Sequence, residues 1–151
     1  GKTHLASALG GAAARQGRAV RFTSASRLVN ELLEARDARD LGRVVARYSR
    51  VELLVLDELG YLPLAGAAAE LLFQVLSERN ERRSLIVTTN LPFGEWTQVF
   101  TDVRLCRAVI DRLTHKAHII ETGSQSARLQ EALKRNKKTR IAEEPEPANG
   151  R

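Results

Sequence analysis

Gly1-Lys2-Thr3-His4-Leu5-Ala6 is the stretch on which the fold of this chain depends. A Gly-Lys-Thr sequence that leads into an alanine- and leucine-rich helix is the way a phosphate-binding P-loop ends. In that motif the lysine reaches the β- and γ-phosphates, the threonine hydroxyl binds Mg²⁺, and the helix N-terminus offers unpaired N–H groups. The full pattern is G-x-x-x-x-G-K-[ST], of which this chain contains the last three residues. Its meaning therefore depends on whether the other half of a nucleotide site follows.

An apolar run with two acids at its end supplies that other half. Leu53-Leu54-Val55-Leu56-Asp57-Glu58 is typical of a strand buried on both faces of a parallel sheet. Its acids lie at the carboxyl edge of the sheet, where open α/β folds bind ligands. In a P-loop hydrolase Asp57 would hold Mg²⁺, and Glu58 would orient or deprotonate the attacking water. The alternative is a surface Asp-Glu pair after a core strand, and the upstream Gly-Lys-Thr favours the nucleotide site.

Strands and helices alternate along the chain, which predicts an α/β fold with a mostly parallel sheet. Asn90 follows a second apolar strand and lies at the same edge as Asp57. It is either a turn residue before Leu-Pro or a hydrogen-bond partner of a bound phosphate or water. The predicted order is helix 5–16, strand 19–23, a helix capped by Ser24 or Ser26, helix 38–48, strand 53–56, helix 68–82, strand 84–89, a turn at 95–99, helix 104–114 and strand 117–121.

Composition narrows the class of protein. The chain has 151 residues, enough for one domain with a sizeable core, and its apolar runs are shorter than the roughly 18 residues of a membrane span. Its single cysteine, Cys106, excludes an internal disulfide framework and suits a reducing cytoplasm. The net charge of +6 favours an anionic partner, nucleic acid first, although a basic tail contributes much of this excess.

The amino-acid composition changes after Gly123, and we divide the chain there. Residues 1–123 are the predicted core, residues 124–135 a predicted short helix, and residues 136–151 a predicted disordered tail that is basic and then acidic. The basic part either holds phosphates through salt-dependent contacts or is a solvated end.

Three longer segments resemble the IstB-like ATPases: residues 54–64 (LVLDELGYLPL), residues 81–96 (ERRSLIVTTNLPFGEW) and residues 111–119 (DRLTHKAHI). These are AAA+ helper proteins encoded beside the transposase in a class of bacterial insertion sequences, and they are relatives of the DnaC helicase loader. The resemblance covers residue 1 to about residue 135. It implies a P-loop NTPase with an AAA+ core, in which a mostly parallel sheet is the middle layer of an α/β/α arrangement.

The resemblance also implies a function. Such a protein is an ATPase that uses ATP and Mg²⁺, binds double-stranded DNA and forms homo-oligomers through nucleotide-bridged interfaces. It directs or stimulates its cognate transposase at a target, in the cytoplasm and without a membrane partner. A DnaC-like replicative helicase loader shares this core and is the alternative. The loader interpretation predicts a helicase-binding N-terminal extension, whereas the transposition interpretation predicts a neighbouring transposase gene.

The family motifs match individual residues of this chain. The nucleotide-binding Walker A positions are Gly1, Lys2, Thr3 and His4, and the metal positions are Thr3 and Asp57. The catalytic positions include Glu58 and Asn90, the latter at the position called sensor 1.

Two arginines complete the implied site. Arg112 falls where related loaders have an arginine finger that acts on the nucleotide of a neighbouring subunit, where charge develops on the γ-phosphoryl oxygens. The alternative for Arg112 is a salt bridge on a helix face. Arg128 falls on the sensor-2-like Ser-Tyr-Arg of the family, but the sequence here is Ser126-Ala127-Arg128, so an aromatic packing partner is missing.

The chain as given begins inside the P-loop, so the first strand and most of the loop are missing from it. We therefore expect this polypeptide by itself to hold ATP poorly, and an inactive remnant with weak DNA or subunit binding is a further alternative. We also expect strand 117–121 to lack its central neighbour and exposed sheet edges to favour aggregation.

Overall fold

The computed structural model describes residues 1–123, within which Lys2–Ile119 form one compact unit. The predicted helix 124–135, the predicted tail 136–151 and Arg128 lie outside the described residues. No helix of the described part is long and apolar enough to cross a membrane. The elements are α1 (Lys2–Arg15), β1 (Val20–Ser24), α2 (Ala25–Asp37), α3 (Leu41–Arg50), β2 (Leu53–Leu59), α4 (Ala67–Arg79), β3 (Ser84–Thr89), the 3₁₀ helix η1 (Phe93–Gln98) and α5 (Val103–Thr114).

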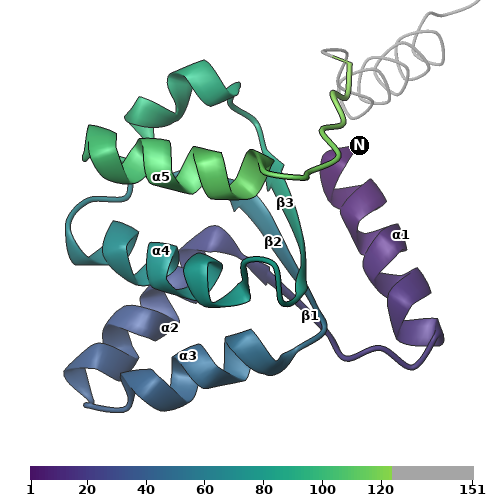
Figure 1. Cartoon of the computed structure of the whole chain (residues 1–151), viewed down its shortest axis with the longest axis horizontal. Coiled ribbons are helices and arrows are strands. Elements are labelled where there is room, and N and C mark those ends of the chain that lie inside the picture. The colour runs from purple at the N-terminus through teal and green to yellow at the C-terminus, as the bar shows by residue number, and fades with distance from the viewer. Residues whose placement is uncertain (124–151) are drawn as a thin grey trace, which may run out of the picture. The chain divides into compact units, whose positions relative to one another are not determined.

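Three parallel strands in the order β1-β2-β3 form the sheet, with β2 in the centre (Figure 1). The register aligns Phe22 with Val55 and Val55 with Ile86. Because all three strands run the same way, their carboxyl ends meet at one edge of the sheet. The ends of β2 and β3, with the acids and polar residues singled out above, therefore lie together.

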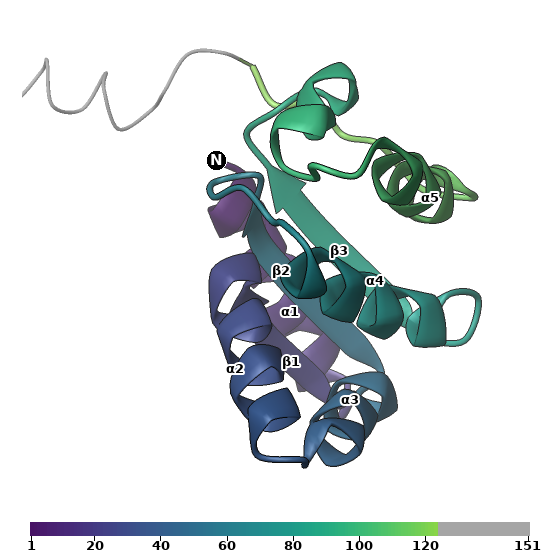
Figure 2. The same ribbon diagram turned by 90° about the vertical axis from the view of Figure 1, so that its left-hand side faces the viewer.

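Helices cover both faces of the sheet. Among the helices of residues 1–123, α1 covers one face, and α2 to α5 lie on the side of the other face (Figures 1 and 2). The side chains of β2 alternate between these layers: Leu53 and Val55 pack in a small cluster with Ala6 of α1, whereas Leu54 and Leu56 belong to the large core beneath the other helices. This α/β/α arrangement with a parallel sheet confirms the predicted fold class.

Local sequence explains where the main helices begin. Ser24 is the N-cap of α2, and its hydroxyl accepts a hydrogen bond from the backbone N–H of Arg27. Asp102 caps α5 in the same way, by accepting from Arg104 and Leu105. Helix α3 begins at Leu41, later than predicted, since the positive φ at the preceding Arg39 (58°) ends the previous helical run.

The strand predicted at residues 117–121 is not formed. These residues follow α5 without strand structure, and Ile119 is 60 % exposed. The apolar pattern suits a strand, but a strand is stable only when a neighbour completes its backbone hydrogen bonds. No strand within residues 1–123 pairs with this segment, so that prediction is wrong.

A buried arginine ties three segments together. Arg79, in the last turn of α4, is 1 % exposed, and its guanidinium donates to the backbone carbonyls of Tyr48, Val51 and Ser84. Burial, and secondarily the charge of Arg83, lowers the Arg79 pKa to about 10, so the group remains charged at neutral pH. The end of α3 and the starts of β2 and β3 are thereby held to α4.

Candidate functional site

Asp57 is the centre of the carboxyl edge. It lies near the end of β2, is 5 % exposed, and follows Leu53 and Val55 on the face covered by α1. The hydroxyl of Thr3, in the first turn of α1, lies 3.2 Å from Asp57 Oδ1 and donates to it. Thr88 of β3 donates to the same carboxylate oxygen. The Asp57 carboxylate thus joins α1, β2 and β3. The two hydroxyls supply the hydrogen bonds without which a buried carboxylate would be unfavourable.

A β-bulge shapes the backbone directly after this carboxylate. Leu56 pairs with Val87 and Leu59 pairs with Thr89, so β2 has one residue more than β3 between the two pairs. Glu58, within that interval, has a φ of 60°, in the left-handed region that residues with a side chain seldom adopt. Bulges of this kind redirect a side chain, and they are common beside functional sites.

The bulge turns Glu58 out of the sheet. Its backbone N–H donates to Thr88 Oγ1 at 3.0 Å, which replaces the missing ladder bond. Its side chain is exposed, although the residues on both sides of it are buried. The carboxylate of Glu58 therefore faces solvent beside the buried carboxylate of Asp57, as a group that acts on a water molecule would have to.

Gly60 brings the end of β3 against this turn. Gly60 has a φ of 108°, and a Cβ placed there would lie 3.2 Å from Thr89 Oγ1 and 3.3 Å from Asn90 Oδ1. Only glycine combines this backbone conformation with so close an approach. The exposed side chain of Asn90 is thereby held at the same edge as Glu58. We call Thr3, Asp57, Glu58, Thr88 and Asn90 the edge site.

The other Walker A residues predicted to bind nucleotide lie around the start of α1. Lys2 is its first residue and is exposed, and His4 is exposed in the same turn. Gly1, the residue before, is exposed as well. The first turn of a helix has unpaired N–H groups and a positive dipole end, so the Lys2 ammonium adds to a region already suited to anions. The hydrogen bond from Thr3 to Asp57 holds this helix terminus at the edge site.

The oxygen atoms present suit Mg²⁺. Asp57 provides a carboxylate and Thr3 a hydroxyl 3.2 Å from it, and both are the hard oxygen ligands that Mg²⁺ prefers. Mg²⁺ in nucleotide sites usually takes one or two protein oxygens, with phosphate and water completing the octahedron. Residues 1–123 contain no cluster of three or more His, Cys, Asp or Glu side chains that could hold a metal. The donor set fits a metal bound together with a phosphate.

Arg112 lies apart from the edge site. Its guanidinium carbon is 4.6 Å from the centre of the Phe73 ring on α4, a cation–π contact. His115 and Lys116, just beyond α5, approach Glu81 at 3.7 and 3.8 Å, and Glu81 lies before β3 at the opposite edge of the sheet. Arg112 forms no salt bridge within the described residues, so its structural contact is a stack on an aromatic ring.

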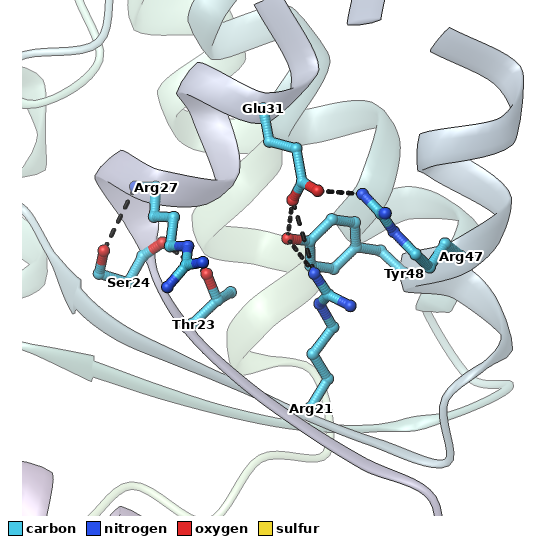
Figure 3. Close-up of polar contacts among 7 residues, drawn as sticks. All are labelled: Arg21, Thr23, Ser24, Arg27, Glu31, Arg47 and Tyr48. Carbon is cyan, nitrogen blue, oxygen red and sulfur yellow. Dashed lines mark hydrogen bonds and ion pairs between the residues drawn. The ribbon is translucent and has the colours of Figure 1, made fainter. Parts of the chain in front are cut away.

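A second polar cluster is structural. Glu31 of α2 accepts from Arg47 and from the Tyr48 hydroxyl of α3, and Arg21 of β1 lies 4.4 Å from the centre of the Tyr48 ring (Figure 3). Burial, and then the hydrogen bond to Glu31, raises the pKa of Tyr48. These contacts join β1, α2 and α3. An open hollow of about 470 Å³ beside them is lined by residues of α2 and contains no part of the edge site.

Every residue of the edge site except Thr88 was named from the sequence, and Gly60 was not singled out there either. The contact of Thr88 with Asp57 depends on the register of β2 and β3, which a local pattern does not contain. For Gly60 a clue was available, since an isolated glycine at the end of a strand often marks a bulge or a close approach of another backbone.

Comparison with known sequences gives a family. The model of the family described as IstB-like ATP binding protein matches residues 1–135. A protein of Sinorhizobium fredii assigned as an insertion-sequence ATP-binding protein is 41 % identical over 133 residues, which are 88 % of this chain and 45 % of that protein. One of Pseudomonas aeruginosa with the same assignment is 40 % identical over 134 residues, 89 % of this chain and 51 % of its own length. The chain spans about half the length of the curated relatives it matches.

Solved structures with the same fold come from DNA replication initiators. DnaA from Aquifex aeolicus with bound AMPPCP has a TM-score of 0.69 and 20 % identity, covering 92 % of this chain and 42 % of that one. A DNA replication initiation factor has a TM-score of 0.67 and 19 % identity, covering 97 % and 43 %. At these identities the likeness concerns the fold, which is that of AAA+ P-loop domains.

Proposed function

Because this chain belongs to the family of IstB-like ATP-binding proteins, we propose that it is the ATP-hydrolysing part of a helper protein for a transposase. The observation that supports this most is that the hydroxyls of Thr3 and Thr88 both donate to one buried carboxylate oxygen of Asp57. Motifs separated by more than fifty residues in the sequence meet there, at the edge of the sheet where such folds bind ligands.

Each residue of the edge site has a role in the proposed reaction. Lys2 and the N-terminus of α1 attract the phosphates, while Thr3 and Asp57 hold Mg²⁺. When bound, Mg²⁺ neutralises charge on the β- and γ-phosphate oxygens. Glu58 orients the attacking water and accepts its proton, since it is a carboxylate directed to solvent by the bulge. Asn90 donates to the γ-phosphate or positions the same water.

Arg112 serves a neighbouring subunit in this proposal. Its place near α4, away from the edge site of its own chain, suits a group that acts in a second copy. There the guanidinium would offset the charge that develops on the γ-phosphoryl oxygens. Homo-oligomers through such nucleotide-bridged contacts are therefore part of the proposed function.

The proposed partners are double-stranded DNA and the cognate transposase, in the cytoplasm. The net charge of +6 supports an anionic partner. The curated relatives are assigned as insertion-sequence proteins, which favours the transposition helper over a helicase loader. Direction of the transposase to a target would be the purpose of the ATP cycle.

The test uses the intact protein that contains this chain. Glu58→Gln keeps the shape of the side chain and removes the base, so we expect ATP binding to persist and hydrolysis to fall by about 10²-fold or more. Glu70→Gln, an exposed acid on α4, is the matched control and should hydrolyse ATP at the parent rate. Equal hydrolysis by the parent and Glu58→Gln proteins would refute the assignment, and so would a parent protein that does not bind ATP.

A further inference from the structure

Thr88 lies on the same face of the sheet as Asp57. Side chains of a strand alternate between the two faces, and Ile86, two residues before Thr88, packs against the small cluster beneath α1 that contains Val55. Asp57 follows Val55 by the same interval on the neighbouring strand β2. The face covered by α1 therefore carries both Thr88 and Asp57, and Thr88 is only 7 % exposed.

The hydroxyl of Thr88 has a single proton, which fixes the direction of its two hydrogen bonds. It donates this proton to Asp57 Oδ1, since an ionised carboxylate only accepts. With the proton in use, Thr88 Oγ1 accepts from the backbone N–H of Glu58 at 3.0 Å. No other side chain of residues 1–123 is hydrogen-bonded to both acids. Thr88 is thus the direct link between them in this part of the chain.

The two oxygens of the Asp57 carboxylate have different surroundings. Oδ1 accepts from Thr3 and Thr88, whereas Oδ2 has no hydrogen-bond partner within residues 1–123. Oδ2 is not enclosed either, because Arg79 Nε is the one buried side-chain nitrogen or oxygen of the described residues that lacks a partner. The two hydroxyls hold the carboxylate by one oxygen and leave the other open to a ligand. Carboxylates that bind metals are commonly held by hydrogen bonds in this way.

A second buried threonine shows that burial in a strand does not require such contacts. Thr23 of β1 is 5 % exposed, and its hydroxyl donates locally, to the carbonyl of the next residue at 3.4 Å. It lies on the opposite face of the sheet from Asp57, because Arg21, two residues before it, contacts α3. Thr23 satisfies only its own hydroxyl, whereas Thr88 joins the two acids that end the apolar run of β2.

We propose that Thr88 is a positioning residue for ATP hydrolysis, which directs Asp57 Oδ2 to the bound metal and holds Glu58 toward the attacking water. This inference rests on the proposed function, in which Asp57 binds the metal and Glu58 acts on the water. A displacement of Asp57 reaches the backbone of Glu58 through two hydrogen bonds, so the two acids are positioned as one unit. Thr88 acts through these acids and touches no substrate.

The first test removes the hydroxyl and keeps the shape of the side chain. In the intact protein, Thr88→Val should raise the Mg²⁺ concentration for half-maximal ATP hydrolysis by about tenfold or more, as loss of a group that holds a metal ligand does. The rate constant at saturating Mg²⁺ and ATP should fall by about tenfold or more, because the backbone of Glu58 loses its hydrogen bond. ATP affinity without Mg²⁺ should stay within about twofold of the parent, since no group that contacts nucleotide is changed.

Two further variants separate the hydroxyl from the rest of the side chain. Thr88→Ser keeps the hydroxyl and should restore the rate constant and the Mg²⁺ dependence to within about threefold of the parent. Thr88→Cys has a weaker donor and should lie between the serine and valine variants. It replaces Thr88→Val as the test if the valine variant does not fold, which circular dichroism shows.

The matched control is Thr23→Val, which removes a buried hydroxyl on the opposite face of the sheet. It should hydrolyse ATP at the parent rate and with the Mg²⁺ dependence of the parent. Hydrogen exchange of the nucleotide-free protein adds a measurement that does not depend on activity. In Thr88→Val the Glu58 amide has lost its acceptor, so peptides that contain it should exchange at least about tenfold faster there than in the parent, Thr88→Ser and Thr23→Val proteins.

Several results would contradict the positioning role. They are a parent-like rate and Mg²⁺ dependence in folded Thr88→Val or Thr88→Cys, a serine variant no better than the valine variant, unchanged exchange of the Glu58 amide, and an equal loss in Thr23→Val. Equal weakening of ATP binding with and without Mg²⁺ would also contradict it, by making Thr88 purely structural. These results leave ATP hydrolysis by the parent intact, whereas a parent protein that binds no ATP would refute the proposed function and the role of Thr88 with it.

Discussion

Thr88 shows how much of the edge site depends on a single hydroxyl. Its Oγ1 accepts from the Glu58 N–H and donates to the Asp57 carboxylate, so it fixes both acids at once. It is 7 % exposed, which leaves water little access to replace it. A hydrogen bond to a buried charged group contributes more than one between neutral groups.

We expect Thr88→Val to destabilise the protein by about 1–3 kcal/mol, because the shape is kept and the buried Asp57 carboxylate loses a donor. Thr88→Ser keeps the hydroxyl and should cost about 1 kcal/mol or less. Urea unfolding of the two variants measures the difference. Equal stability of Thr88→Val and Thr88→Ser would mean that the hydroxyl does not support the site.

Arg79 holds three backbone carbonyls through its buried guanidinium. Arg79→Leu removes the three hydrogen bonds to the carbonyls of Tyr48, Val51 and Ser84, which should cost about 2–4 kcal/mol. Arg83→Ala changes an exposed neighbour of the same charge and should stay within about 0.5 kcal/mol of the parent. Thermal or urea unfolding would decide this, and similar losses in both variants would argue against a structural role for Arg79.

Residue types with a direct chemical use were predictable from the sequence. Thr3, Asp57 and Glu58 stand in motifs that are typical of phosphate and metal sites, which predicted that they lie close together, and the structure brings the first two within hydrogen-bond distance. Thr88 and Arg79 were not predictable, since their partners are set by strand register and by helix packing. Those contacts exist only once the fold has formed.

The spacing of apolar residues predicted most helices and strands correctly. It failed for the strand at residues 117–121, which would need a neighbouring strand to pair with. The continuous apolar run of β2 predicted burial on both faces of the sheet, and the structure has an apolar layer on each face. Residues 117–121 have a comparable apolar character but pair with no strand in the described part of the chain. Pairing is a property of the whole sheet, and a local pattern does not contain it.

Hydrogen exchange should separate these elements. Backbone amides of β2 are hydrogen-bonded to both neighbours and buried, so we expect them to exchange only on global unfolding. Amides of residues 117–121 should exchange within seconds to minutes in the 151-residue chain, because they are exposed and lie outside the sheet. Mass spectrometry of peptides from the two regions makes the comparison. Protection of residues 117–121 equal to that of β2 would contradict the description of this segment.

At the scale of the whole molecule, the described sheet has two outer strands, β1 and β3, whose free edges can pair with other chains. We therefore expect the isolated 151-residue chain to aggregate at micromolar concentration. Light scattering with a melting curve measures this. A soluble monomer that melts cooperatively would show that these edges are adequately protected.

The separation of Arg112 from the edge site of its own chain predicts complementation between subunits. In the intact protein, Arg112→Ala should bind ATP but hydrolyse it at least about 10²-fold more slowly. A Lys2→Ala protein should fail to bind ATP yet still present Arg112. Mixing the two should restore hydrolysis at sites that combine an intact edge site with an intact arginine. Absence of any recovery would place the role of Arg112 within its own chain.

If Thr3 and Asp57 hold Mg²⁺ together with ATP, binding of a fluorescent ATP analogue must depend on Mg²⁺, which titrations with and without Mg²⁺ measure. In the intact parent protein we expect Mg²⁺ to strengthen binding by at least about tenfold. Asp57→Asn keeps the size of the side chain but removes its charge, and it should abolish this Mg²⁺ effect. If the parent and Asp57→Asn proteins respond to Mg²⁺ equally, the edge site is not the nucleotide site.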